Sequence, residues 1–178
     1  MGGGLDYSGF TSWVAEVFDP DAETWSITPP MAKRRSGHTA TLLHNGQVLF
    51  IGGESDLHQR GDGGEATAEV FDPKSNTFYR TGDLTLPRHW HTSTLLNDGT
   101  VIVIGGSSTV MDGQIEIEQF DPTTGRFLVM GQLQKPRRAH TATLLPDGRI
   151  LVVGGYGSAA ATSAEIFNPQ TGKSTVIS

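Results

Sequence analysis

The sequence contains no cysteine. Without thiols the chain can form no disulfide, hold no thiolate-ligated metal and use no cysteine nucleophile. Runs of basic residues are also scarce: the longest is Lys33–Arg35, and the formal net charge is −6. Because phosphate binding requires a stripe of basic side chains, we expect no nucleic-acid partner.

Long apolar runs are absent as well. None approaches the roughly 20 residues of a membrane span, so we expect no such span. The first ten residues, "MGGGLDYSGF", have neither the charged segment nor the apolar segment of an export signal. The compartment is therefore left open by the sequence.

Glycine, by contrast, is abundant. The chain has 23 glycines in 178 residues, nearly twice the usual share of about 7%. No collagen-like period accompanies them, so they indicate many tight turns and close backbone approaches.

Three stretches repeat almost the same twenty residues: "RRSGHTATLLHNGQVLFIGG" from Arg34, "PRHWHTSTLLNDGTVIVIGG" from Pro87 and "PRRAHTATLLPDGRILVVGG" from Pro136. A second phrase of the type "AEVFDP" occurs four times, with its Phe at positions 18, 71, 120 and 167. The steps between those Phe residues are 53, 49 and 47. A period of this length is typical of repeat architectures.

Each unit is predicted to hold four short antiparallel strands and no helix. Runs such as "HTSTLL" and "VIVIGG" are rich in Thr or β-branched residues and have strand length. Asn45-Gly46, Asp98-Gly99 and Asp147-Gly148 predict two-residue primed turns that join the first two strands of each unit. Four antiparallel strands in about 50 residues indicate a β-propeller blade.

With these features the sequence resembles the Kelch family of β-propellers, in which a diglycine ends the second strand and an aromatic residue follows. The residues that carry the resemblance are Gly52, Gly53 and Phe71; Gly105, Gly106 and Phe120; and Gly154, Gly155 and Phe167. The resemblance implies an all-β fold built of stacked blades, in a ring of about six or seven. It implies little about activity, because one fold hosts many functions.

We predict a single partial-propeller domain over residues 1–178, with a two-stranded partial blade at 1–30 and full blades at 36–82, 88–131 and 137–178. In the partial blade, "MGGG" is expected to be the end of a second strand. Met1 then corresponds to Ile51, and the diglycine is Gly2-Gly3. The chain is then either a fragment of a larger propeller or a unit that assembles with a second copy.

Most repeated residues are predicted to be structural, because a repeated position usually serves the unit. Arg35, Arg88 and Arg137 are expected to bond a neighbouring unit, with the repeated glutamates Glu16, Glu69, Glu118 and Glu165 as natural partners. A ring of these arginines could instead bind anions. His38, His91 and His140 are expected to be structural, with a metal ring as the alternative. The diglycines precede no helix, so they indicate close packing rather than phosphate binding.

Function is predicted to lie in the loops between the second and third strands, which differ from unit to unit: residues 5–13, 54–67, 107–116 and 156–163. In a four-stranded meander these loops emerge on the same face as the links between units, and loops on a rigid scaffold carry recognition. The richest of them, at 54–67, could hold a metal, but its ligand spacing matches no known site. The candidate binding residues are Asp6, Tyr7, Trp13, Glu54, Asp56, His58, Arg60, Trp90 and Tyr156. Packing between units is an equal alternative for Trp90.

We expect a non-catalytic module without a cofactor that binds a protein or glycan partner, or serves as a spacer in a larger surface protein. The alternative is part of a propeller enzyme, either a galactose-oxidase-like oxidase or a sugar isomerase, whose active site lies outside this chain. The oxidase cofactor needs a Cys bonded to a Tyr, and the chain has no Cys. The style of the repeats resembles bacterial Kelch-type proteins, many of which are exported.

Overall fold

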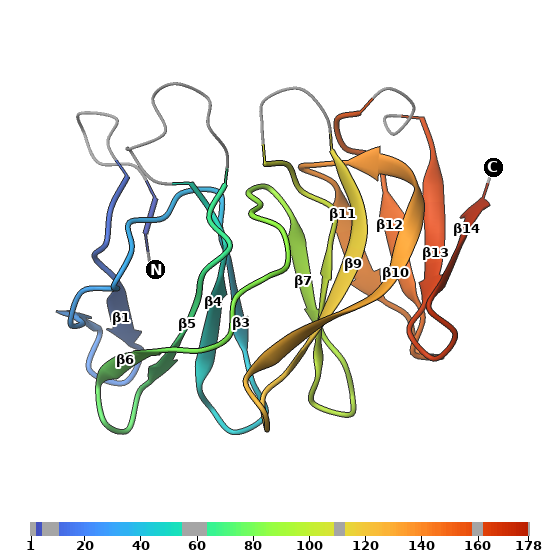
Figure 1. Cartoon of the computed structure of the whole chain (residues 1–178). Coiled ribbons are helices and arrows are strands. Elements are labelled where there is room, and N and C mark those ends of the chain that lie inside the picture. Colours follow the sequence, from blue (N-terminus) through green and yellow to red (C-terminus); the bar gives the residue numbers. More distant parts are fainter. Residues whose placement is uncertain (1–2, 5–10, 55–63, 109–112, 158–161, 178) are drawn as a thin grey trace.

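A computed structural model describes residues 3–4, 11–54, 64–108, 113–157 and 162–177. Within these residues the chain consists of strands and connecting segments, with no helix. The strands form three four-stranded antiparallel sheets and one two-stranded sheet, which stand side by side (Figure 1). This confirms the predicted all-β fold of three full blades and a partial one.

Each sheet is a meander in which strands that follow one another in sequence are paired. The partial sheet comprises β1 (Glu16–Asp19) and β2 (Thr24–Ile27). The first full sheet comprises β3 (Thr39–Leu42), β4 (Val48–Ile51), β5 (Ala68–Asp72) and β6 (Thr77–Arg80). The second comprises β7 (Thr92–Leu95), β8 (Val101–Ile104), β9 (Gln114–Asp121) and β10 (Arg126–Arg137). The third comprises β11 (Thr141–Leu144), β12 (Ile150–Val153), β13 (Ala164–Asn168) and β14 (Lys173–Ile177).

The tenth strand is the longest and runs past residue 131, where the sequence placed the end of the second blade. Its pairing with β9 shifts register between Val129 and Gly131 and again between Gln132 and Arg137. The fourth strand of this sheet therefore merges with the link that leads to the third sheet.

The hairpins between the first two strands of each sheet form where predicted, but the predicted turn type is wrong. In the first full sheet Leu43 N–H donates to the Gln47 carbonyl (2.8 Å), and Gly46 N–H donates to the Leu43 carbonyl (3.0 Å). Three residues therefore lie in the loop, and only the glycine has a positive φ (85°). This is the longer hairpin loop that places Gly at the left-handed position. Asn45 has no positive φ, and its side-chain oxygen accepts a hydrogen bond from Gln47 N–H at 3.0 Å.

Strand β8 shows why the sheets stack. All four of its side chains are fully buried, and the strand is apolar on both faces. Val101 and Val103 pack toward the first full sheet, whereas Ile102 and Ile104 pack toward the third. Successive side chains of a strand point to opposite faces, so this strand needs a neighbouring sheet on each side.

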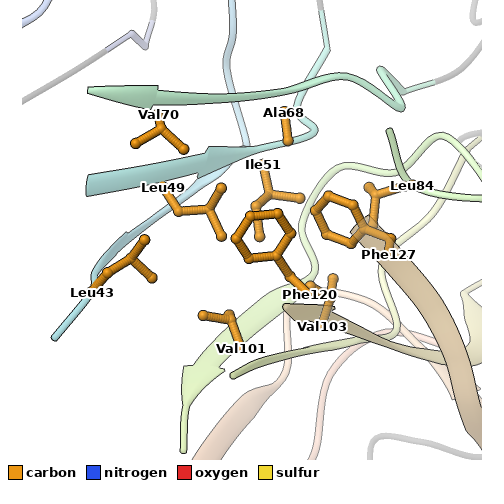
Figure 2. Close-up of a cluster of buried hydrophobic side chains, with 10 residues drawn as sticks. All are labelled: Leu43, Leu49, Ile51, Ala68, Val70, Leu84, Val101, Val103, Phe120 and Phe127. Atoms are coloured by element: carbon orange, nitrogen blue, oxygen red, sulfur yellow. The ribbon is translucent and has the colours of Figure 1, made fainter. Parts of the chain in front are cut away.

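The core is therefore not within a sheet but between sheets. The cluster between the first and second full sheets is drawn in Figure 2 and joins side chains from both. Its members are Leu43, Leu49, Ile51, Ala68, Val70, Leu84, Val101, Val103, Phe120 and Phe127. A matching cluster fills the space between the second and third sheets. Between the partial sheet and the first full sheet the cluster is much smaller, with Met31, Phe50 and Phe71 as its buried members.

Among the described residues no helix is long and apolar enough to cross a membrane.

Candidate binding face

The diglycines hold one sheet to the next. Gly53 N–H donates to the carbonyl of Arg88 at 2.9 Å, and Gly106 N–H donates to the carbonyl of Arg137 at 2.9 Å. In each case the acceptor belongs to the segment that leads into the following sheet. The preceding glycine makes room for this contact: a Cβ on Gly52 would lie 2.4 Å from the Arg88 carbonyl oxygen. Close packing is therefore the role of these glycines in the structure, and no helix follows them in the described residues.

The same contact corrects one sequence prediction. Gly4 N–H donates to the carbonyl of Arg35 at 2.8 Å, and a Cβ on Gly3 would lie 2.5 Å from that same oxygen. Both glycines have positive φ, 70° and 102°. The diglycine of the partial sheet is therefore Gly3-Gly4, one residue later than the alignment of Met1 with Ile51 placed it. The run of glycines leaves the alignment ambiguous by one position, and only the contact with Arg35 resolves it.

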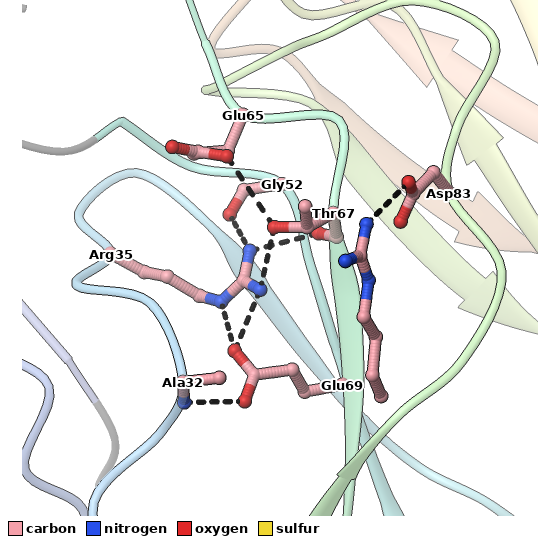
Figure 3. A network of polar contacts seen from close by, with 8 residues as sticks. Ala32, Arg35, Gly52, Glu65, Thr67, Glu69 and Asp83 are labelled. Carbon is pink, nitrogen blue, oxygen red and sulfur yellow. Dashed lines mark hydrogen bonds and ion pairs between the residues drawn. The ribbon is translucent and has the colours of Figure 1, made fainter.

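The repeated arginines are paired with the repeated glutamates, but within one unit. Arg35 lies 2.8 Å from Glu69, and its guanidinium also donates to the carbonyls of Gly52 and Thr67 (Figure 3). Arg88–Glu118 (2.6 Å) and Arg137–Glu165 (2.8 Å) repeat the pair. The prediction of a partner in a neighbouring unit is thus wrong. The arginine precedes its own sheet and folds back over it, closing the gap between the ends of the second and third strands.

These pairs leave no anion-binding ring at the arginines, because each guanidinium is fully buried and engaged by its own carboxylate. The carboxylates also hold the links: Glu69 accepts from Ala32 N–H at 2.7 Å and Glu118 from Thr85 N–H at 2.8 Å. Glu16, the remaining repeated glutamate, is exposed on β1.

The histidines connect successive sheets. His91 Nε2 lies 2.9 Å from Thr39 Oγ1 of the preceding sheet, and His140 Nε2 lies 2.9 Å from Thr92 Oγ1. Burial, together with the charge of Arg88, lowers the pKa of His91 well below its usual value. Burial and Arg137 lower the pKa of His140 to about 4. No group of three or more His, Asp or Glu in the described part of the chain is placed to hold a metal ion.

The links and the second-to-third-strand segments meet on one face, as the meander topology predicts. Three isolated antiparallel bridges mark it: Ser36 with Glu54, His89 with Ser107 and Arg138 with Tyr156. In Figure 1 this is the upper face, opposite the tight hairpin turns. It is referred to below as the loop face.

Two of the candidate binding residues, Trp90 and Tyr156, come together on the loop face. The guanidinium carbon of Arg138 lies 4.7 Å from the centre of the Trp90 ring and 5.5 Å from the centre of the Tyr156 ring, within cation–π range of both. These three side chains and Ala139 line a surface cavity of about 260 Å³. The rings remain accessible: 37% of Trp90 and 67% of Tyr156 is exposed.

The backbone of Trp90 is held in an unusual conformation. Its φ is 55°, a value that a bulky residue rarely adopts. Its N–H donates to the Gly37 carbonyl (2.8 Å) of the preceding unit, and its carbonyl accepts from Ala139 N–H (2.8 Å) of the next. Gly37 and Ala139 are its counterparts in the repeat and also have positive φ. Only the second unit places a large aromatic ring there, which supplies the asymmetry that a binding site requires.

Trp90 therefore packs between units, and its contact with a partner stays a prediction. The edge of its indole lies against Gly37, where a Cβ would come within 2.8 Å of the ring. The other part of the ring faces Arg138 and solvent. Arg138 was not predicted from the sequence, because it stands beside Arg137, the arginine that belongs to the repeat. The available signal was that the third unit has Arg where the first has Ser36 and the second has His89.

The remaining candidates are spread over the loop face. Trp13 is exposed, with the Arg34 guanidinium 4.7 Å from its ring centre, a second Arg–Trp pair. Glu54 is half-buried and accepts a hydrogen bond from the Ser36 hydroxyl at 3.0 Å. Asp6, Tyr7, Asp56, His58 and Arg60 lie outside the described residues.

A larger cavity, of about 410 Å³, lies on the opposite face between the hairpin turns of the second and third sheets. Leu96 and Leu144 line it together with polar residues of the turns, among them Asn97 and Gln170. Sequence reasoning did not find this cavity, because nothing in a single unit reveals the space between two.

Comparison with known proteins agrees with the geometry. The family model of the Kelch motif matches residues 137–178. The structure resembles that of YjhT, with a TM-score of 0.72 and 16% identity, over 96% of this chain and 54% of that one. Residues 137–178 therefore match the Kelch motif, and the chain has the fold of a β-propeller.

Among curated proteins, spermatocyte protein spe-26 of Caenorhabditis elegans is 36% identical to this chain over 96 residues. Those residues are 53% of this chain and 15% of spe-26. The chain thus spans about half of YjhT and a small part of spe-26. The pair formed by Trp90 and Tyr156 is where this chain departs from its own repeat.

Proposed function

We propose that the chain is a non-catalytic Kelch-repeat module that binds a protein partner through the loop face, with Trp90 and Tyr156 as the contact residues. The observation that carries the proposal is that the Arg138 guanidinium lies within cation–π range of two accessible aromatic rings. Aromatic residues are enriched among the few residues that dominate binding energy.

Preorganisation supports this role. Arg138 is a positioning residue: its attraction to both rings limits their motion before a partner arrives, which lowers the entropy lost on binding. The Trp90 backbone is fixed by hydrogen bonds to the units on both sides. A strained conformation that surrounding structure maintains is a recurrent feature of ligand-contact sites.

A glycan is the second candidate partner, favoured by the open face of Tyr156, which is 67% exposed. An enzyme with its active site outside this chain is the remaining alternative.

The proposal is tested with the double variant Trp90→Ala/Tyr156→Ala and the matched control Tyr79→Ala. Tyr79 is also well exposed but lies on the outer strand β6, away from the loop face. Candidate proteins captured by the parent chain, and a glycan array, are measured with all three chains. Loss of two anchoring rings should weaken binding by at least about thirtyfold.

Unfolding midpoints of the variants establish that the fold is intact. Binding by Tyr156→Ala alone is also measured, because this residue is 67% exposed and its loss disturbs the packing least. Equal binding by the double variant and the parent, with Tyr79→Ala also unchanged, would reject the loop face as the binding surface. Signal on the glycan array alone would transfer the role to a sugar ligand.

A further inference from the structure

The gap between the second and third sheets differs from the gap between the first and second full sheets at the face of the hairpin turns. The residue that precedes the repeated Phe faces each gap. In the first gap this residue is Val70, which is 3% exposed and belongs to the apolar cluster. In the second gap it is Gln119, which is half-buried and lines the cavity of about 410 Å³. Both sheets beside this cavity are complete four-stranded meanders.

Hydrogen bonds fix the orientation of the Gln119 amide. The Thr100 hydroxyl donates to Asp98 Oδ1 at 2.7 Å, because a carboxylate only accepts. The same hydroxyl therefore accepts from Gln119, whose Nε2 lies 2.8 Å away. The carbonyl oxygen of Gln119 is left as a hydrogen-bond acceptor at the cavity, without a donor among the described residues.

Asp98 adds a negative charge that forms no ion pair in the described part of the chain. Its Oδ1 also accepts from Thr100 N–H at 3.0 Å, so both of its donors are neutral. Across the cavity, Asp147 is instead paired with Arg149 at 2.6 Å. The described residues that line the cavity include no Lys, Arg or His. The lining therefore offers acceptors and one unbalanced negative charge to a ligand.

The base of the cavity is apolar. Leu96 and Leu144 line it and belong to the hydrophobic cluster between the two sheets. Pro146 and Pro169 add apolar surface from the two turns of the third sheet. A long basic side chain has matching chemistry, because it packs an aliphatic stem on apolar surface and keeps its charged end at polar groups.

We propose that this cavity binds the side chain of an arginine from a partner protein. The guanidinium has five N–H donors in one plane and no acceptor, so it can bond the Asp98 carboxylate and the Gln119 carbonyl together. Arginine is also enriched at protein interfaces. The cavity lies on the face opposite Trp90 and Tyr156, so this site does not rest on the function proposed for the loop face.

The probe that tests the site is N-acetyl-arginine methylamide, titrated into the isotope-labelled chain and followed by NMR. We expect saturable shifts of the amide signals of Thr100 and Gly148. N-acetyl-citrulline methylamide has nearly the same shape but no charge, and it should bind at least about fivefold more weakly. Asp98→Asn and Gln119→Val should each weaken binding of the arginine probe by at least about fivefold.

Both variants carry the residue that the first unit has at the same position, Asn45 and Val70, so we expect both to fold. Unfolding midpoints verify this. The matched control Asp83→Asn removes a charge outside the cavity and should leave the affinity unchanged.

Three results would overturn the proposal. The first is the absence of saturable shifts, or equal binding of the arginine and citrulline probes. The second is parent-like affinity in Asp98→Asn or in Gln119→Val. The third is equal weakening by Asp83→Asn, since the probe would then be attracted to the net charge of the chain rather than to this cavity.

Discussion

The hydroxyl of Thr39 lies 2.9 Å from Nε2 of His91, and the two residues belong to different sheets. Thr92 and His140 repeat the contact at 2.9 Å one unit later. Each bond joins the first strand of one sheet to the segment that precedes the first strand of the next. The packing of sheet on sheet therefore depends on imidazoles that are buried and uncharged.

Stability should consequently fall on mild acidification. The pKa of His140 is lowered to about 4 and that of His91 well below 6.5, chiefly because burial disfavours the charged ring. Below pH 6.5 the unfolded chain binds protons that the folded chain does not, so the free energy of unfolding decreases as pH falls toward 4. For His140 the loss between pH 7.5 and 5 is about 2 kcal/mol. Urea unfolding at a series of pH values in this window measures it.

The variant His140→Gln isolates the effect, because an amide does not titrate in this window. Its unfolding free energy should depend less steeply on pH than that of the parent, by about the contribution of one buried histidine. His44, exposed at a hairpin turn, provides the matched control His44→Gln, which should keep the parent slope. An unchanged slope in His140→Gln would show that the histidine does not carry the acid sensitivity.

Alanine variants of two glycines distinguish the cost of a steric clash between sheets from the cost of backbone strain. Gly105 and Gly154 have φ values of 61° and 67°, so alanine is strained at both positions. At Gly105 a Cβ would also lie 2.5 Å from the Arg137 carbonyl oxygen, whereas at Gly154 nothing lies within 4 Å. We expect Gly154→Ala to cost about 1 kcal/mol and Gly105→Ala roughly 3 kcal/mol. Chemical unfolding compares them, and equal losses would mean that close approach at the diglycine is unimportant.

The buried pair Arg88–Glu118 should be far more sensitive to mutation than the exposed pair Arg80–Asp83. Both side chains of the first pair are fully buried, and removing Glu118 leaves an uncompensated guanidinium. Glu118→Ala should cost about 3–5 kcal/mol, and Asp83→Ala, in a pair that is 63% and 41% exposed, about 0.5 kcal/mol or less. Thermal or urea unfolding gives both values. Similar losses in the two variants would contradict the structural role of the buried pair.

Periodicity carried most of the fold prediction. The recurring Phe at 18, 71, 120 and 167 indicated four units, and the Asn-Gly and Asp-Gly pairs marked the hairpins within three of them. These features are local and repeat with fixed spacing, so a single sequence reveals them. Burial was not predictable in the same way: "EVF" is buried in β5 and exposed in β1, because burial depends on the surrounding strands as well as on the residues themselves.

Contacts between units were the least predictable part. The partner of Arg35 was correctly expected to be a repeated glutamate, but the spacing did not reveal that the side chain folds back on its own sheet. The positions of the hairpin turns were predicted correctly, but their type was not. A primed turn needs positive φ at both central residues, and only the glycine of each pair has it. On the loop face, Trp90 and Tyr156 were predicted as binding residues from their chemistry. Arg138 was not, because only the structure shows that its guanidinium lies near both rings.

The stacking of sheets through the diglycines is the claim on which the loop face and its pair of rings depend. Amide hydrogen exchange of individual glycines, followed by NMR, tests it most directly. Gly53 and Gly106 donate to carbonyls of the following unit, whereas Gly155 has no following sheet among the described residues. We predict slow exchange at Gly53 and Gly106 and fast exchange at Gly155. Equally fast exchange at all three glycines would contradict the account.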